Sequence, residues 1–184
     1  MTTDDILDGI LTREAGWRDA QTRPDGTVDP PTNRGITLPT LQQTGHLLGL
    51  QPPILLDDLK QLDAGGARTI YVAVYMDAPG FTIGNVPFEP LRVQLIDFGI
   101  NSGPERAIRW LQRVLRIPVT GVMDVALVNC LKSYTQVHTL AIVNDALVAA
   151  RSYMIDQLVD HGQLRKQDEE GVESRALSFF LAVP

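Results

Sequence analysis

Cysteine and histidine are scarce in this chain of 184 residues, which contains one cysteine and three histidines. Cys130 cannot form a disulfide within the chain. Its neighbours Leu127, Val128 and Leu131 are apolar, which favours a buried thiol over a nucleophile. The histidines are scattered and form no zinc-binding pattern with the cysteine. We therefore expect no metal site.

Long apolar runs and an excess of positive charge are also lacking. No apolar run approaches the roughly 18 residues that a membrane-spanning helix needs. Residues 1–5 are acidic where a secretory signal peptide would be basic. The net charge of -6 disfavours general binding of nucleic acid. These observations predict no stable membrane insertion, no nucleic-acid partner and synthesis in the cytoplasm without a signal peptide.

Hydrophobic residues make up 44% of the chain and charged residues 21%, as in an ordinary globular protein. Apolar residues recur at helical spacing almost throughout, which predicts a mainly α fold. The turn-rich segment 77–90 is the best candidate for a boundary between two lobes, 1–88 and 89–184, packed as one compact unit. Further helices are expected at 37–48, at 57–76 with a break at Gly65-Gly66, from a Ser102–Glu105 capping box onward, at 135–158 and at 170–181.

Glu14 is the most informative single residue. Ile6, Leu7, Ile10 and Leu11 form an apolar stripe on an N-terminal helix, and Glu14 falls on the same stripe. A carboxylate on a buried face is costly to desolvate, and desolvation raises the pKa of a glutamate above about 4.3. A glutamic acid of this kind can donate a proton near neutral pH.

A structural role for Glu14 is the alternative, because Arg13 or Arg18 could pair with it at the end of the helix. The segment that follows, residues 16–36, is rich in glycine, proline, aspartate, threonine and asparagine. Such composition predicts an irregular loop or a short hairpin. Long segments of weak regular structure inside a compact domain are often functional.

The segment 92–116 contains five arginines and only two acidic residues, Asp97 and Glu105. This segment is locally positive inside an acidic protein. A solvated helix face is the ordinary interpretation, and contact with anionic wall polymers is the alternative. Trp110 lies between Ile108 and Leu111, and core packing is expected for it.

Two sets of motifs together resemble one known family. Glu14-Ala15-Gly16-Trp17 is followed by Thr32-Asn33-Arg34-Gly35-Ile36-Thr37, which is similar to the N-terminal signature of the glycoside hydrolase family 108 N-acetylmuramidases. The chain departs from that signature at Ala15 and at Asp29-Pro30-Pro31, where the family usually has glycines. The second set is similar to the helical peptidoglycan-binding region of the family and comprises Asp97-Phe98, Asn101 to Pro104, Trp110 to Gln112, Gly121, Arg151, and Gly171 with Arg175.

This resemblance implies a lysozyme-like fold and cleavage of peptidoglycan between N-acetylmuramic acid and N-acetylglucosamine. It further implies Glu14 as the catalytic acid and no metal or organic cofactor. We expect a monomer that acts on the cell wall as a phage or prophage endolysin, released through a holin. The alternative is a non-catalytic wall-binding or phage structural protein on the same fold.

The other expected site residues carry structural alternatives. Asp29 or Asp25 is the candidate second carboxylate, and Asp29 is favoured; a turn aspartate is the alternative. Thr32 is expected to orient an attacking water, or else to satisfy loop backbone. The candidate substrate-binding residues are Trp17, Gly35, Thr37, Tyr75 and Asn101. For these the alternatives are packing of Trp17 on the first helix, helix capping by Thr37 and turn capping by Asn101.

Overall fold

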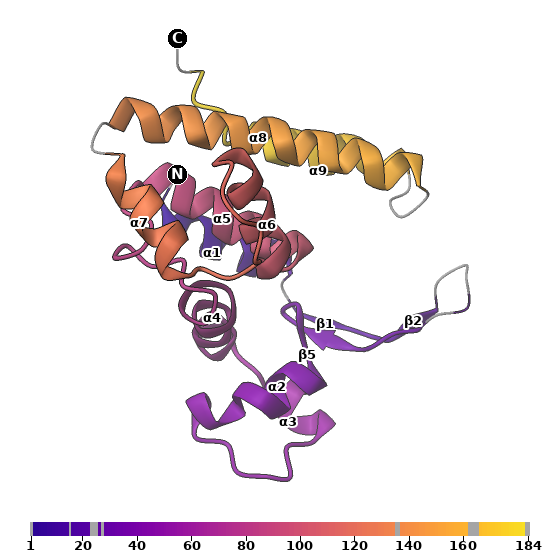
Figure 1. The fold of residues 1–184 in the computed structure, drawn as a ribbon. Coiled ribbons are helices and arrows are strands. Elements are labelled where there is room, and N and C mark those ends of the chain that lie inside the picture. The colour runs from indigo at the N-terminus through magenta and orange to yellow at the C-terminus, as the bar shows by residue number, and fades with distance from the viewer. Residues whose placement is uncertain are drawn as a thin grey trace. The chain divides into compact units, whose positions relative to one another are not determined.

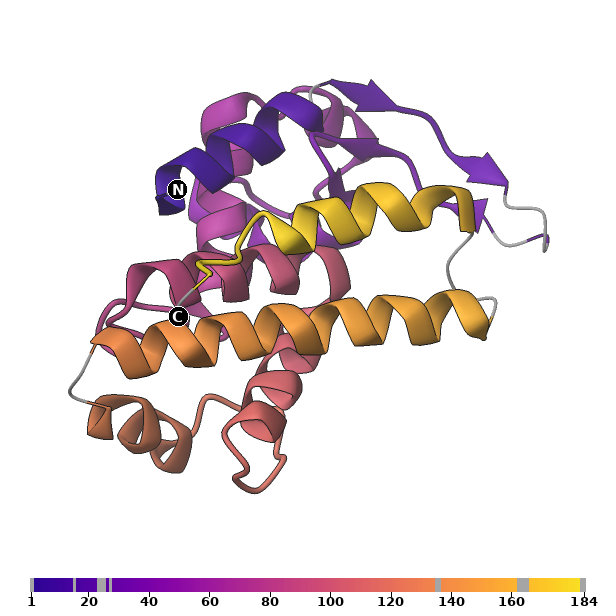
Figure 2. The same cartoon turned by 90° about the horizontal axis from the view of Figure 1, so that it is seen from above.

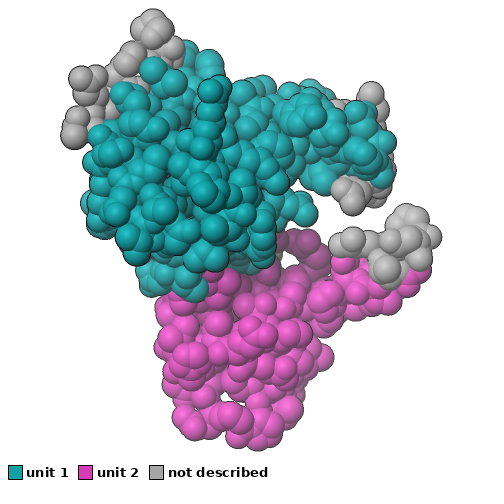
Figure 3. Space-filling model, viewed as in Figure 1, with its two compact units in different colours: residues 1–3, 75–184 teal, residues 4–74 magenta. Residues whose placement is uncertain are grey.

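A computed structural model describes residues 2–14, 16–22, 26, 28–134, 137–161 and 166–182 (Figures 1 and 2). The chain divides into two compact units, Asp4–Val74 and Met1–Thr3 with Tyr75–Pro184 (Figure 3). The catalytic and wall-binding lobes expected at 1–88 and 89–184 stay a prediction. In the described part of the chain, no helix is both long and apolar enough to span a membrane.

The unit Asp4–Val74 begins with the amphipathic helix α1 (Thr3–Arg13), which buries Ile6, Leu7 and Ile10 as its apolar stripe predicts. Helix α2 (Leu38–Thr44) continues into the 3-10 helix η1 (Gly45–Leu48), which confirms the helix expected at 37–48. The Oγ1 atom of Thr37 caps α2 by accepting a hydrogen bond from the amide of Thr40 at 3.3 Å. Pro39 lies in the first turn, where its missing N–H costs nothing.

The region expected as a helix over 57–76 is interrupted, but not at the predicted glycines. Helix α3 (Leu56–Lys60) ends before Asp63, and α4 (Ala64–Val72) starts after it. The carboxylate of Asp63 accepts a hydrogen bond of 2.7 Å from the amide of Gly66. Gly65 and Gly66 therefore lie in the first turn of α4, where a strong aspartate cap outweighs the poor helix propensity of glycine. The π-helical segment η2 (Ala73–Asp77) follows α4.

Short strands occupy much of the segment expected as a loop or hairpin. The strands β1 (Trp17–Arg18), β4 (Thr32–Asn33) and β5 (Ile36–Thr37) form an antiparallel sheet in the order β1-β4-β5. The strands β2 (Gln21–Thr22) and β3 (Val28–Asp29) form a separate antiparallel pair (Figure 1). With helices making up most of the remaining structure, the predicted mainly α, lysozyme-like fold class is confirmed.

Helix α5 (Glu89–Ser102) is the centre of the unit Tyr75–Pro184. Every residue from Leu91 to Gly99 is buried, as in a helix covered on all sides. Helices α6 (Pro104–Val114) and α8 (Val137–Asp160) pack on it, and α9 (Lys166–Leu177) runs beside α8 (Figure 2). Helix α7 (Val125–Ser133) precedes α8. The two C-terminal helices expected from the sequence are thus present.

The capping box expected at Ser102–Glu105 and the solvated face expected to include Arg92 are both wrong. The N-cap of α6 is Gly103, with a φ of 88° and no side-chain cap, because Ser102 is still the last residue of α5. Glu105 pairs with Arg109 instead of closing a capping box. Arg92 does not belong to a solvated basic face, because it is buried and donates to the carbonyl oxygen of Val86 at 2.9 Å.

A buried ion cluster holds α5, α8 and α9 together. The carboxylate of Asp97, fully buried, accepts a hydrogen bond of 2.7 Å from Arg151 and is also paired with Arg175. Burial lowers the pKa of Arg151, and the carboxylate of Asp97 opposes that shift. These three residues are widely separated in sequence, and all three belong to the second set of family-like motifs. Their spacing in the sequence gives no hint that they meet.

Candidate active site

Glu14 directly follows α1, and its amide donates a hydrogen bond of 2.8 Å to the carbonyl oxygen of Ile10. The helical hydrogen-bond pattern of α1 therefore continues to the backbone of Glu14. The side chain is about one-third exposed, at 35%, and its Oε2 accepts a hydrogen bond of 2.6 Å from Arg18. Arg18, one of the two arginines named as possible partners, therefore pairs with Glu14. The carboxylate is half-buried and ion-paired, not sequestered among apolar side chains.

The register of the three-stranded sheet decides which side chains accompany this pair. Arg18 lies opposite Thr32, and Thr32 lies opposite Thr37. Directly opposite residues of antiparallel strands share a face, whereas neighbours along a strand alternate. Arg18, Thr32 and Thr37 consequently form a row on one face, and the Arg18 ion pair joins Glu14 to that row. The site offers a carboxylate, a guanidinium and two hydroxyls, which are groups that suit a sugar ligand.

The turn between β4 and β5 brings the backbone against Glu14. Arg34 and Gly35 have φ values of 52° and 75°, as a two-residue type I′ hairpin turn requires. The carbonyl oxygen of Arg34 accepts a hydrogen bond of 3.1 Å from the buried Tyr71 hydroxyl. A Cβ at Gly35 would overlap that hydroxyl and lie 3.3 Å from Cγ of Glu14. The structure thus shows why the sequence needs glycine here, while contact of Gly35 with sugar stays a prediction.

Asn33 and Tyr71 are the residues that sequence reasoning missed. Asn33 is buried on the other face of the sheet, and its Nδ2 donates to the carbonyl oxygens of Leu59, Lys60 and Leu62 at 2.9, 3.0 and 3.1 Å. It satisfies carbonyls at the end of α3 and fixes the hairpin to that helix. The available signal was the position of Asn33 inside the family-like Thr-Asn-x-Gly-Ile-Thr motif. Tyr71 carried no comparable signal.

The structure does not bring Asp29, the favoured second carboxylate, into the sheet that carries Thr32. Asp29 is half-buried in β3 and pairs in register with Gln21, so it belongs to a different sheet from Thr32. Asp25 lies outside the described residues, as does Ala15 of the first motif. The role of Asp29 as a second carboxylate therefore stays a prediction.

The remaining candidates have structural contacts of their own. The half-buried Trp17 donates from Nε1 to Asp19 at 2.7 Å, and the ammonium of Lys60 lies 5.5 Å from its ring centroid. Thr37 caps α2, as its structural alternative predicts. Tyr75 and Asn101 belong to the other unit. Burial raises the pKa of Tyr75, and Asn101 donates to the carbonyl oxygen of Asp97 at 2.6 Å. None of these contacts tests a role in substrate binding.

Metal ligands are not assembled at this site. Within the described ranges, no three side chains of histidine, cysteine, aspartate or glutamate are grouped so that they could hold a metal ion. The single cysteine, Cys130, is half-buried and forms no disulfide.

Comparisons with known proteins bear on the fold and on the family of this chain. No curated protein sequence matches the chain significantly. The solved structure of Brucella abortus SagA is similar, with 24% sequence identity and a TM-score of 0.65 over 97% of this chain and 95% of that one. At this identity the likeness shows the fold. The family model for glycosyl hydrolase 108 matches residues 7–103, more than half of the chain of 184 residues and including all of the Glu14 site. The chain therefore belongs to glycosyl hydrolase family 108.

Proposed function

We propose that this glycoside hydrolase is a muramidase, which cleaves peptidoglycan between N-acetylmuramic acid and N-acetylglucosamine with Glu14 as the general acid. The observation that carries the proposal is the contact of Glu14 with the Gly35 turn. Gly35, in the tight Arg34-Gly35 turn, lets the backbone lie against the Glu14 side chain, which is joined through Arg18 to the row of Thr32 and Thr37. The proton donor Glu14 thus adjoins a row of side chains that can form hydrogen bonds with a sugar.

The chemistry asks two things of the site. The protonated carboxyl of Glu14 gives its proton to the glycosidic oxygen as the bond to the sugar carbon breaks and positive charge grows on the ring. Water then adds to that carbon and gives its proton to the Asp29 carboxylate, or to the Glu14 carboxylate that the first step has left ionised. Thr32 orients the water, or Asp29 supplies the second carboxylate. Arg18 occupies Oε2 of Glu14 in the structure, so it withdraws when a saccharide binds there.

The decisive experiment is mass spectrometry of fragments released from purified Gram-negative sacculi. The wild-type chain is expected to release muropeptides with N-acetylmuramic acid at the reducing end. Glu14→Gln is expected to lower the rate by about 10²- to 10⁴-fold, the usual contribution of a general acid. Glu89→Gln is the matched control, because Glu89 is an exposed glutamate at the start of α5, paired with Arg92. Wild-type rates from Glu14→Gln, or fragments ending in N-acetylglucosamine, would contradict the proposal.

The same preparation separates the proposal from its alternative, a wall-binding or phage structural protein on the same fold. Sedimentation of the chain with sacculi, without any release of reducing sugar, would favour that alternative.

The proposed role as a phage or prophage endolysin has its own test. Expression in the cytoplasm is expected to lyse cells only when a holin is co-expressed, and lysis without a holin would contradict that route.

A further inference from the structure

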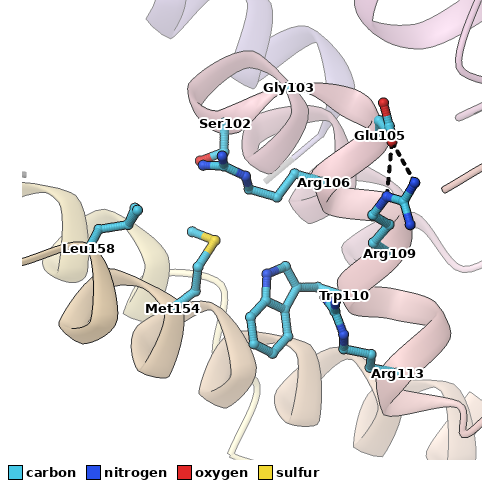
Figure 4. A pocket seen from close by; sticks show the side chains of 9 residues that line it. All are labelled: Ser102, Gly103, Glu105, Arg106, Arg109, Trp110, Arg113, Met154 and Leu158. Carbon is cyan, nitrogen blue, oxygen red and sulfur yellow. Dashed lines mark hydrogen bonds and ion pairs between the residues drawn. The ribbon is translucent and has the colours of Figure 1, made fainter. Parts of the chain in front are cut away.

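A pocket of about 460 Å³ lies in the unit Tyr75–Pro184, between α6 and α8 (Figure 4). Helix α6 contributes Arg106, Arg109, Trp110 and Arg113, and α8 contributes Met154 and Leu158. The volume falls in the range of sites for small ligands. Trp110 is only half-buried here, so the expectation that it packs in the core is wrong. Its indole forms part of the pocket wall instead.

The arginines of this pocket differ in whether a carboxylate pairs with them. Arg109 is held by Glu105, with hydrogen bonds of 2.9 and 2.7 Å. Among the residues that the structure describes, no carboxylate pairs with Arg106 or Arg113. The guanidinium of Arg113 lies 4.9 Å from the ring centroid of Trp110, a cation–π contact that leaves its edge available for hydrogen bonds. Two cations are thus available to an anion in a protein whose net charge is -6.

Their spacing defines what they can hold. Arg106, Trp110 and Arg113 stand at positions i, i+4 and i+7, so they share one face of α6. At 1.5 Å of rise per residue, the two arginines are about 10 Å apart along the helix. Trp110 lies between them, and the thioether of Met154 and the side chain of Leu158 face the same space from α8 (Figure 4). The pocket therefore alternates cation, apolar surface and cation.

We propose that this pocket binds a short, extended acidic peptide whose two carboxylates engage Arg106 and Arg113 while an apolar side chain between them contacts Trp110 and Met154. Arginine forks bind carboxylates with two parallel hydrogen bonds. In an extended pentapeptide the first, third and fifth side chains share one face, and the first and last residues lie about 13 Å apart. The long side chains of two arginines about 10 Å apart along α6 can meet carboxylates at that span. A nucleic acid is disfavoured, because the net charge of -6 repels a long polyanion, whereas a short dianion meets only the local field. The Glu14 site contributes no residue, so this proposal does not rest on the proposed hydrolysis.

The test is isothermal titration calorimetry of the full chain with the blocked pentapeptide glutamate-serine-leucine-serine-glutamate. The isosteric peptide with glutamine at both ends is the ligand control. The acidic peptide is expected to bind and the glutamine peptide is not. The double variant Arg106→Gln/Arg113→Gln is expected to weaken binding about tenfold or more, a loss of about 1.4 kcal/mol. Arg116→Gln, at an exposed arginine outside the pocket, is expected to bind like the wild type.

A second measurement locates the ligand. In a Trp17→Phe chain, Trp110 is the remaining tryptophan, so a change of its fluorescence on titration places the peptide at this pocket. Circular dichroism checks that each variant is folded. Equal binding of both peptides, equal losses in the double variant and Arg116→Gln, or no binding would overturn the proposal. Tighter, arginine-dependent binding of a short oligothymidylate would overturn it in favour of a nucleic acid.

Discussion

Gly35 lies directly against Glu14, with a site for a Cβ only 3.3 Å from Cγ of the glutamate. The contact depends on a positive φ of 75° at the second residue of the turn, which glycine adopts without strain. The hairpin turn therefore packs against the Glu14 side chain, although the two residues lie at opposite ends of the segment 14–35.

Gly35→Ala is expected to lower both the free energy of unfolding and the glycan-cleaving rate per folded molecule. The new Cβ adds a clash with Tyr71 and Glu14 to the cost of a left-handed alanine. Gly49→Ala is the matched control, because Gly49 has the same φ of 75° with open space around it. The control should lose only about 1–2 kcal/mol of stability and no activity. Urea unfolding and muropeptide release measure both effects, and equal behaviour of the two variants would refute the role of the contact.

Asn33→Asp is expected to destabilise the chain more than Asn33→Ala does. The alanine variant leaves three carbonyl oxygens without the Nδ2 donor, for which about 1–3 kcal/mol is a reasonable loss. An ionised aspartate has no donor at all and directs its own charge at the same oxygens. Urea unfolding of the two variants decides the order. An aspartate variant as stable as the alanine variant would show that this hydrogen-bond cluster does not hold the hairpin.

Asp97→Asn is expected to cost about 3–5 kcal/mol, because it removes the carboxylate that pairs with two arginines, one of them fully buried. Glu105→Gln supplies the contrast. It breaks the exposed Arg109 pair, whose side chains are 40% and 69% exposed, and is expected to cost less than about 1 kcal/mol. Denaturant midpoints at a fixed pH compare the two. Similar losses would mean that the buried cluster contributes no more than a surface pair.

Asp124→Asn is expected to lower Tm at pH 7, and to lower it by less as the pH falls below 3.8. The amide of Leu127 and the hydroxyl of Thr120 hold the pKa of the Asp124 carboxyl below its ordinary value of 3.8. A carboxyl with a lowered pKa stabilises the folded state above pH 3.8, and the gain disappears as the pH falls through the lower folded value. Asparagine still caps α7 but carries no charge. Melting curves from pH 7 to pH 3 check this, and a constant gap in Tm would contradict it.

The local features of the fold were predictable because their signals are local. The apolar stripe of α1, the Thr37 cap of α2 and the helical periodicity of α8 are each written within a few turns of sequence. Errors arose where two local signals competed. The aspartate cap at Asp63 moved a helix break away from two glycines, and the continuation of α5 through Ser102 removed a capping box that the residue types alone predicted.

The site was predictable only in part, for a related reason. The motif residues pointed to Glu14, Thr32 and Gly35, but no pattern in the sequence pointed to Tyr71. Its hydroxyl reaches the turn from a helix more than thirty residues away along the chain, at Arg34. The same holds for Trp110, whose apolar neighbours predicted burial, while the packing of α6 on α8 left its indole at a pocket.

By itself the sequence determined a mainly helical chain, a glutamate at the end of its first helix and a glycine in a turn that follows. Periodicity and capping act between neighbours, so residue order alone carries them. Only the tertiary structure decided that Arg18 pairs with Glu14, and that Asp97 pairs with Arg151 and Arg175. Ion pairs and close contacts depend on strand register and helix packing, which bring together side chains whose separation along the chain carries no such information.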